Sequence, residues 1–285
     1  MENTEVKTHS GWRLRQATLI TRPSLITKEH LFFVGDVHGK FIHFGEKIKR
    51  LSIEDALIIQ CGDFGLGFLD EQQDIQELSF LNEICKERNI DLAILRGNHD
   101  NPEMFNGTEF RKKLLETTIR NIVTVPDYHV MIYQKYEGAD KKAILCVGGA
   151  ISVDRSARKA GSSCWLDEGF KYDEAIIRER AKFGRQIHIV ATHTAPGFLD
   201  DWIGSPSSNI VEEYFQYDPT LKEDVKNERI QLSNLFEAIH CITDMRIAHW
   251  YHGHFHKHLE REHSFVENDE DKTKFHGLAE LEISC

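Results

Sequence analysis

Short polar clusters rich in Asp, His and Asn recur along this chain, and each lies close behind an apolar run. They read Gly-Asp-Val-His-Gly at 35–39, Gly-Asp at 62–63, Gly-Asn-His-Asp at 97–100, Thr-His at 192–193 and Gly-His-Phe-His at 253–256. Carboxylate, amide and imidazole groups without a thiolate suit Mn, Fe, Zn or Co better than a soft all-sulfur site would. The clusters therefore indicate a metal site built from distant parts of the chain.

The spacing inside the clusters also favours metal binding. Asp36 and His38 are two residues apart, so both side chains can lie on the same side of an extended segment, and the same holds for His254 and His256. Asp63 has two carboxylate oxygens, one for each of two ions. Two cations about 3.5–4 Å apart can clamp the attacking and leaving oxygens of a phosphoryl transfer, and a bound cation lowers the pKa of its water. We therefore predict a dinuclear site bridged by Asp63.

The apolar runs that precede the clusters have the length of short strands. They cover residues 31–34, 57–61, 92–95, 189–191 and 247–251, with further strand patterns at 129–133 and 143–147. Helical spacing of apolar residues occurs at 41–51, 75–87, 172–183 and 228–239. This alternation predicts β-α-β units in an α/β fold, in which functional side chains gather where strands end.

The order of the motifs between Asp36 and His256 resembles that of the calcineurin-like metallophosphoesterase superfamily, namely Asp-x-His, Gly-Asp, Gly-Asn-His-Asp, His and Gly-His-x-His. The stretch Gly-Gly-Ala-Ile-Ser-Val-Asp-Arg ending at Arg155, and Gly-Asp-Phe-Gly at 62–65, are most similar to small bacterial and phage members. The resemblance implies a four-layer α/β/β/α sandwich, in which two mixed β-sheets are flanked by helices and the site lies at one edge.

The resemblance also implies a role for each motif residue. The first metal ion would be held by Asp36, His38, Asp63 and His256, and the second by Asp63, Asn98, His193 and His254. His99 would bind no metal; it would face the scissile phosphate and protonate the leaving oxygen. The implied cofactor is a pair of divalent ions, with Mn preferred and Fe, Zn, Ni or Co as alternatives.

The second motif departs from the Gly-Asp-x-x-Asp-Arg-Gly pattern of the Ser/Thr protein phosphatases. Leu66 and Gly67 stand where that pattern has an Asp that supports the catalytic His and an Arg that grips phosphate. Support for His99 must therefore come from elsewhere, and protein phosphatase activity of that type is in doubt. Asp100 is adjacent, but residues 100–103 also resemble a helix start, so we favour a capping role for Asp100 or Asn101.

Three arginines are candidates for binding the substrate phosphate in place of the missing one. Arg155 and Arg158 follow the glycine pair at 148–149, and Arg96 directly precedes Gly97. An arginine fork matches phosphate oxygens bidentately. Each of the three can equally be a solvated loop charge or an ion-pair partner, and Arg155 is the preferred candidate.

Composition and charge limit the partners and the compartment. The net charge of −11 counts against long duplex nucleic acid, although short single strands and nucleotides stay compatible with it. No apolar run is long enough for a membrane helix, and the first ten residues lack a secretory apolar region. The six cysteines have no C-x-x-C spacing. We therefore expect a cytoplasmic protein. The resemblance to the metallophosphoesterases implies that it acts on a phosphorylated small molecule, a nucleotide or a phosphoprotein.

The expected organisation is one large domain with two additions. Residues 1–30 are expected to form an arm or added strand packed on a body that spans 31–285. A loop and helix insertion is expected at about 195–245. Its aromatic residues, including Phe198 and Trp202, either wall the substrate or pin the insertion to the body. The charged run at 267–274 is expected to be a hairpin loop.

Together these features predict a cytosolic dinuclear-metal hydrolase of phosphoric esters, in which a hydroxide bridging the metals attacks phosphorus. The preferred substrates are phosphomonoesters, because of the similarity to compact bacterial and phage members. The alternative is a phosphodiesterase acting on cyclic nucleotides, nucleic acid ends or nucleotide conjugates. A non-catalytic scaffold is disfavoured, since the chain retains the ligands and His99.

Overall fold

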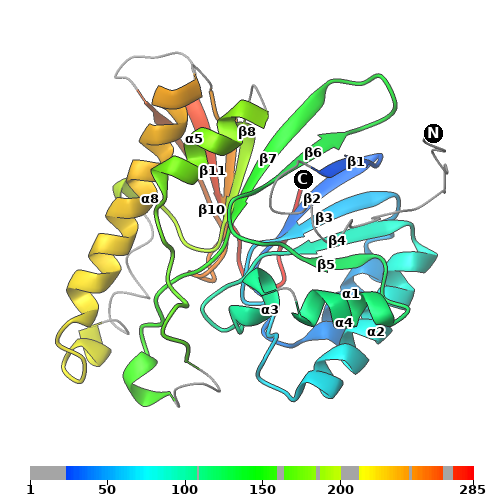
Figure 1. The fold of residues 1–285 in the computed structure, drawn as a ribbon, viewed down its shortest axis with the longest axis horizontal. Coiled ribbons are helices and arrows are strands. Elements are labelled where there is room, and N and C mark those ends of the chain that lie inside the picture. Colours follow the sequence, from blue (N-terminus) through cyan, green and yellow to red (C-terminus); the bar gives the residue numbers. More distant parts are fainter. Residues whose placement is uncertain are drawn as a thin grey trace, which may run out of the picture.

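The computed structural model describes residues 24–107, 109–158, 164–183, 187–199, 212–243, 246–265 and 272–285. Two mixed β-sheets pack face to face, and helices cover the outer face of each sheet (Figure 1). The fold is the α/β/β/α sandwich that the motif order implied. No helix among the described residues is long and apolar enough to cross a membrane.

The first sheet has five strands in the order β12-β2-β3-β4-β5. Its parallel strands are β2 (His30–Val34), β3 (Ala56–Gln60), β4 (Ile90–Ile94) and β5 (Ile122–Thr124), and β12 (Ile283–Ser284) runs antiparallel to β2. The helices on this side are α1 (Phe41–Arg50), α2 (Glu71–Glu87), α3 (Glu103–Asn106) and α4 (Glu109–Glu116). The predicted helices at 41–51 and 75–87 are thus confirmed, and α2 begins one turn earlier than its apolar pattern.

The second sheet has seven strands in the order β1-β6-β7-β8-β9-β11-β10. Their bounds are β1 Ser24–Thr27, β6 His129–Gln134, β7 Lys141–Val147, β8 Ile187–Thr192, β9 His249–His252, β10 Leu259–Ser264 and β11 Lys272–Gly277. Its covering helices are α5 (Glu174–Phe183) and α8 (Leu221–Thr243), and η1 (Arg155–Ala157) and η2 (Gly197–Leu199) are single 3-10 turns. The pairs β6–β7 and β10–β11 are antiparallel and the other pairs are parallel.

Three apolar cores separate the four layers, and strand periodicity decides which core each residue enters. Val34 and Ile58 point to the helices α1 and α2, whereas Phe33 and Leu57 point into the space between the sheets. Phe33 stacks on Tyr251 of the opposite sheet with ring centroids 3.7 Å apart. Such buried contacts fix the two sheets relative to each other, and therefore fix the edge at which their strands end.

The expected additions to the body are described in part. Residues 24–27 form β1, which pairs in parallel with β6, and residues 1–23 lie outside the described residues. Within 195–245, α8 covers the second sheet, Phe198 packs against Phe236 and Phe275, and Trp202 lies outside the described part. The expectation of a loop through residue 274 is wrong at its end, because residues 272–274 belong to β11.

Candidate metal centre

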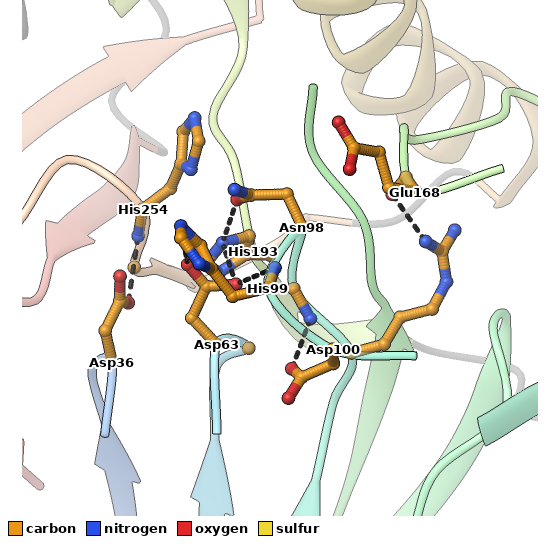
Figure 2. A network of polar contacts seen from close by, with 12 residues as sticks. Asp36, Asp63, Asn98, His99, Asp100, Glu168, His193 and His254 are labelled. Atoms are coloured by element: carbon orange, nitrogen blue, oxygen red, sulfur yellow. Dashed lines mark hydrogen bonds and ion pairs between the residues drawn. The ribbon is translucent and has the colours of Figure 1, made fainter. Parts of the chain in front are cut away.

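The seven predicted metal ligands lie at the ends of strands from both sheets, and the structure brings them together. Asp36 and His38 follow β2, Asp63 follows β3, Asn98 follows β4, His193 follows β8, and His254 and His256 follow β9. Figure 2 shows labelled members of this set converging from several strands. The carboxyl ends of parallel strands meet at one edge of a sheet, and here the edges of two sheets meet.

The first group of donors consists of Asp36, His38 and His256, whose ligand atoms lie within 4.8 Å of one another. His256 Nε2 is 2.9 Å from His38 Nε2 and 2.8 Å from Asp36 Oδ2. Asp36 Oδ2 is buried and has no hydrogen-bond partner of good geometry among the described residues. Three donor atoms converging in this way fit a cation, because each can direct a lone pair at it.

The second group consists of Asp63, His193 and His254, with Asn98 beside it. His193 Nε2 is 3.2 Å from Asp63 Oδ1 and 3.0 Å from Asn98 Oδ1. His193 Nδ1 is 2.8 Å from the carbonyl oxygen of Cys61, so Nδ1 carries the proton that is donated there. This bond directs the Nε2 lone pair into the site, as a metal-binding histidine requires.

Asp63 lies between the two groups. Its carboxylate is within 4.8 Å of the donor atoms of His193 and His254, and in a further group it is equally close to His38 and His99. One carboxylate thus reaches both sets of donors. This position fits the bridge between two ions that the sequence predicted.

The charges in the site also fit a cation. Burial would raise the pKa of Asp36, but the imidazoles of His256 and His38 beside it outweigh burial and hold this pKa below its usual range. Burial likewise opposes ionisation of Asp63, and His193 more than compensates. Burial would lower the pKa of His193, but Asp63 raises it to about 9. Two buried carboxylates therefore stay ionised and attract positive charge, which divalent ions would supply.

Several of these ligands have an unusual backbone conformation. The φ angles of His38, Asp63, His254 and His256 are 50°, 54°, 68° and 51°. Residues other than glycine rarely adopt this left-handed region, and such strain occurs preferentially at functional sites. The sharp turns after the strands thus direct these ligand side chains into the site, which they would not reach if the strands continued in extended conformation.

Close packing explains the glycines that accompany two of the ligands. A Cβ atom at Gly253 would lie 2.2 Å from Asp36 Oδ1, and one at Gly97 would lie 2.0 Å from Asp63 Oδ1. Both distances are far below van der Waals contact. The glycines let the neighbouring loops approach the two carboxylates.

His99 lies beside the metal ligands, next to one of the three candidate arginines. Its backbone N–H donates to Asp63 Oδ1 at 2.8 Å, and its ring Nε2 is 2.6 Å from the guanidinium of Arg158. Arg158 is itself paired with Asp154 at 2.7 Å. Burial lowers the pKa of His99, the Asp63 charge opposes this, and Arg158 lowers the pKa further. Arg158 is therefore the arginine that contacts the proposed catalytic histidine.

Arg155, the candidate that the sequence favoured, points to a different set of partners. Its guanidinium binds Asp218 and Asp224, each at 2.6 Å, and Thr220 at 2.9 Å. These contacts raise its pKa and tie η1 to the start of α8. Acidic groups distant in sequence therefore bind Arg155, whereas Arg158 lies against His99.

Arg96, the third candidate for phosphate binding, also has partners within the protein. Its side chain is buried, and it donates to Asp127 at 2.9 Å and to the carbonyl oxygens of Asp167, Glu168 and Gly169. Arg96 therefore holds the 167–169 turn in place and does not face the site.

Among the described residues, Asp100 forms no hydrogen bond with the His99 ring and caps no helix. Its buried carboxylate accepts hydrogen bonds from the backbone N–H groups of Phe64, Gly65, Leu66 and Gly97 at 2.7–3.1 Å. Asn101 Oδ1 accepts the N–H of Glu103 at 3.1 Å, although the N-cap position of α3 is Pro102 and has no side-chain capping hydrogen bond. Asp100 instead fixes the loop that follows Asp63.

Sequence reasoning missed Ser152 and Glu168. Ser152 Oγ accepts a hydrogen bond from Asn98 Nδ2 at 3.1 Å, and the Ser152 N–H donates to Glu168 Oε1 at 2.7 Å. This orients the Asn98 amide so that Oδ1 faces His193. The only sequence signal was the position of Ser152 shortly after the glycine pair at 148–149.

A four-layer sandwich with carboxylate, amide and imidazole donors at the strand ends of both sheets defines a metal-dependent hydrolase. Residues 30–258 match the family model described as calcineurin-like phosphoesterase. The chain belongs to this family. It is therefore a phosphoric ester hydrolase, and its family typically uses two divalent metal ions.

Comparison with other proteins adds little about the substrate. One solved crystal structure is similar at 12% identity over 88% of this chain and 90% of that chain, with a TM-score of 0.47. A cold-active protein-tyrosine phosphatase of a psychrophile, Shewanella sp., is similar at 14% identity over 91% and 74%, with a TM-score of 0.31. No curated protein matches the chain.

Proposed function

We propose that the protein is a phosphomonoesterase that works with two divalent ions, Mn being the preferred metal. The observation that carries this proposal is that the Asp63 carboxylate lies within 4.8 Å of His38 from the first donor group and of His193 and His254 from the second. The proposed ligands are Asp36, His38, Asp63, Asn98, His193, His254 and His256. When bound, the two cations supply a nucleophile from water near neutral pH and neutralise phosphate charge.

His99 and Arg158 are proposed to act on the ester itself. The Arg158 guanidinium binds phosphate oxygens through its fork of N–H groups. In the structure His99 Nε2 accepts a hydrogen bond from that guanidinium at 2.6 Å; once Arg158 binds the phosphate instead, Nε2 is released to take up a proton from solvent and donate it to the leaving oxygen. Asp63 holds the backbone of His99 and so fixes the distance between the acid and the metal ligands. Monoesters are favoured because their extra negative charge suits an arginine placed next to the histidine.

Location and domain limits also belong to the proposal. The six cysteines form no disulfide bond, which is compatible with a reducing compartment such as the cytoplasm. We propose a catalytic body over residues 31–285, an N-terminal addition over 1–30 and an insertion over about 195–245. The proposed substrate of the protein is a phosphorylated small molecule, a nucleotide or a phosphoprotein.

A substrate panel tests the proposed activity. Metal-loaded protein is assayed with phosphomonoesters, with phosphodiesters and with cyclic nucleotides, and Mn²⁺ is compared with Fe²⁺, Zn²⁺, Ni²⁺ and Co²⁺. We expect monoester turnover that is lost in Asp63→Asn and kept in Asp140→Asn, which changes an exposed aspartate. Turnover of diesters alone would reverse the monoester preference. Absence of hydrolysis above the Asp63→Asn background would favour a binding scaffold.

A further inference from the structure

We propose that Phe68 and Trp165 form an aromatic subsite that binds a planar aromatic ring on the leaving group of the ester. This inference rests on the proposed function, because His99 marks the side on which the leaving group departs. It adds a substrate class, since it selects esters by the ring beside the scissile bond.

The two rings lie next to His99. The Phe68 ring centroid is 5.7 Å from the centroid of the His99 imidazole and 5.8 Å from that of Trp165. The two aromatic side chains meet edge to face at 66°. If the phosphate of the ester binds between Arg158 and the metal ligands, its leaving group points towards His99. The rings of Phe68 and Trp165 would then lie beside that leaving group.

Phe68 is only partly covered by the protein. It is 42% exposed, and the next residue, Leu69, is 45% exposed, whereas Trp165 is half-buried. Exposing an aromatic ring to water beside an active site loses the free energy of its burial. Binding of an apolar partner would recover it.

The loop that presents Phe68 is held firmly. Asp100 accepts the N–H groups of Phe64, Gly65 and Leu66, and Asp74 Oδ2 accepts that of Gly67 at 2.9 Å. Two buried carboxylates thus fix the backbone up to the residue before Phe68. A ring on a fixed loop loses little entropy on binding a partner.

The turn that presents Trp165 is also held in place, by Arg96 and by a backbone hydrogen bond. Arg96 binds three successive carbonyl groups at 167–169, and the N–H of Glu168 donates to the carbonyl oxygen of Trp165 at 3.2 Å. The carboxylate of Glu168 is bound by Ser152, which also binds the proposed metal ligand Asn98. The position of Trp165 is therefore linked to that of the metal site.

The chemistry of the pair favours an aromatic partner over an aliphatic one. Aromatic rings prefer offset or edge-to-face contact with other rings, and the faces and edges of the two residues offer both. The planar ring can be attached close to the ester oxygen, as in an aryl or benzyl ester, or beyond a sugar, as in a nucleotide. The two sources share the same ring chemistry and differ in the distance between ring and phosphorus.

Binding of non-hydrolysable analogues tests the subsite without relying on turnover. The Mn²⁺-loaded protein is titrated calorimetrically with benzylphosphonate and with cyclohexylmethylphosphonate, which differ in the aromaticity of the ring. We expect benzylphosphonate to bind about fivefold more tightly. Phe68→Leu and Trp165→Leu, which keep apolar bulk, should each reduce this preference. Tyr136→Leu, which removes an exposed aromatic ring in the β6–β7 turn, should keep it.

Two pairs of esters then identify the source of the ring. Benzyl phosphate is compared with cyclohexylmethyl phosphate, and adenosine 5′-monophosphate with ribose 5-phosphate, by kcat/KM in the same proteins. In each pair both leaving groups are primary alcohols. A preference in the first pair that falls in Phe68→Leu supports a ring next to the bond. A preference in the second pair that falls in the same way supports a nucleobase.

The inference is overturned if the wild-type protein binds the two phosphonates equally, or if the preference survives in both leucine variants. Circular dichroism of each variant checks that it is folded, and two independent positions guard against one that is not. If no ester is hydrolysed while the phosphonate preference is intact, the proposed function is refuted and the aromatic subsite is retained.

Discussion

Asp63 is the residue on which the proposed centre depends most, because its carboxylate lies within 4.8 Å of donor atoms from both groups, namely His38 of the first and His193 and His254 of the second. Asp63→Asn removes one negative charge and replaces one carboxylate oxygen by an amide nitrogen that cannot bind a cation. We expect metal content, measured by elemental analysis, and ester hydrolysis to fall together by at least about tenfold. Asp140→Asn should retain both. Normal metal content in Asp63→Asn would show that Asp63 is not the bridge.

His99 should affect turnover without affecting metal content. It lies beside Asp63 and Arg158 but belongs to the leaving-group side of the proposed site. His99→Ala should retain both ions and slow esters with poor leaving groups by about 10²–10⁴-fold, because an alkoxide needs a proton more than a nitrophenolate does. A series of esters of increasing leaving-group pKa measures this. An equal loss across the series would mean that His99 steadies charge and transfers no proton.

At the scale of single residues, the sequence predicted the metal ligands better than it predicted which arginine lies at the site. The seven donors that it selected all converge, since spaced Asp, His and Asn residues have few other reasons to follow successive strands. It could not distinguish Arg155 from Arg158. The ion pairs of Arg155 are with Asp218 and Asp224, more than 60 residues away, and no local pattern shows them. Asp100 was misjudged for the same reason, as its partners lie in another loop.

At the scale of elements, the loop between β3 and α2 is fixed by acidic side chains. Asp74, in the first turn of α2, accepts the N–H of Gly67, while its Oδ1 is buried with no hydrogen-bond partner among the described residues. Burial raises the pKa of Asp74 to about 6. The folded state thus holds this proton more tightly than the unfolded state does, and stability from this group is lost as the pH rises through 6.

Asp74→Asn should remove this dependence. The amide oxygen still accepts the N–H of Gly67, and the side chain cannot ionise. Relative to wild type, we expect the variant to gain on the order of 1 kcal/mol in unfolding free energy between about pH 4 and about pH 7. Urea unfolding across this range measures the difference, and Asp70→Asn, at the exposed N-cap, serves as a control. A difference that does not change with pH would contradict the assignment.

Strands and helices with strong apolar periodicity were predicted within a few residues. Examples are β4, where the expected 92–95 became Ile90–Ile94, and α5, where 172–183 became Glu174–Phe183. The charged strands β10 and β11 had no such pattern, because β10 is at the edge of its sheet and presents polar residues to water. The two-residue β12 was equally beyond prediction, since pairing with β2 alone defines it.

At the scale of the whole molecule, the proposed metal centre joins the two sheets. Asp36, Asp63 and Asn98 extend from the first sheet, and His193 and His254 from the second. Ions held by both sides would resist separation of the sheets, because the unfolded chain lacks the assembled site. At a free Mn²⁺ concentration about 100-fold above the dissociation constant, one site should add about 2.7 kcal/mol to the unfolding free energy.

Thermal unfolding with added Mn²⁺ and with a chelator checks this stabilisation. We expect a higher midpoint with Mn²⁺ in the wild-type protein and a much smaller shift in Asp63→Asn. A Mn²⁺-dependent shift of equal size in both proteins would place the stabilising ions elsewhere. Mg²⁺ at the same concentration is a suitable comparison, since it prefers all-oxygen ligands over histidine.

The left-handed backbone at His38, Asp63, His254 and His256 has an evolutionary consequence. Each such residue gives up roughly 1 kcal/mol that a glycine would not. Glycine there would relax the turn and delete the functional group in a single step. Selection for thermal stability alone would therefore favour stable but inactive variants. Engineering of a more thermostable enzyme should leave these four positions unchanged.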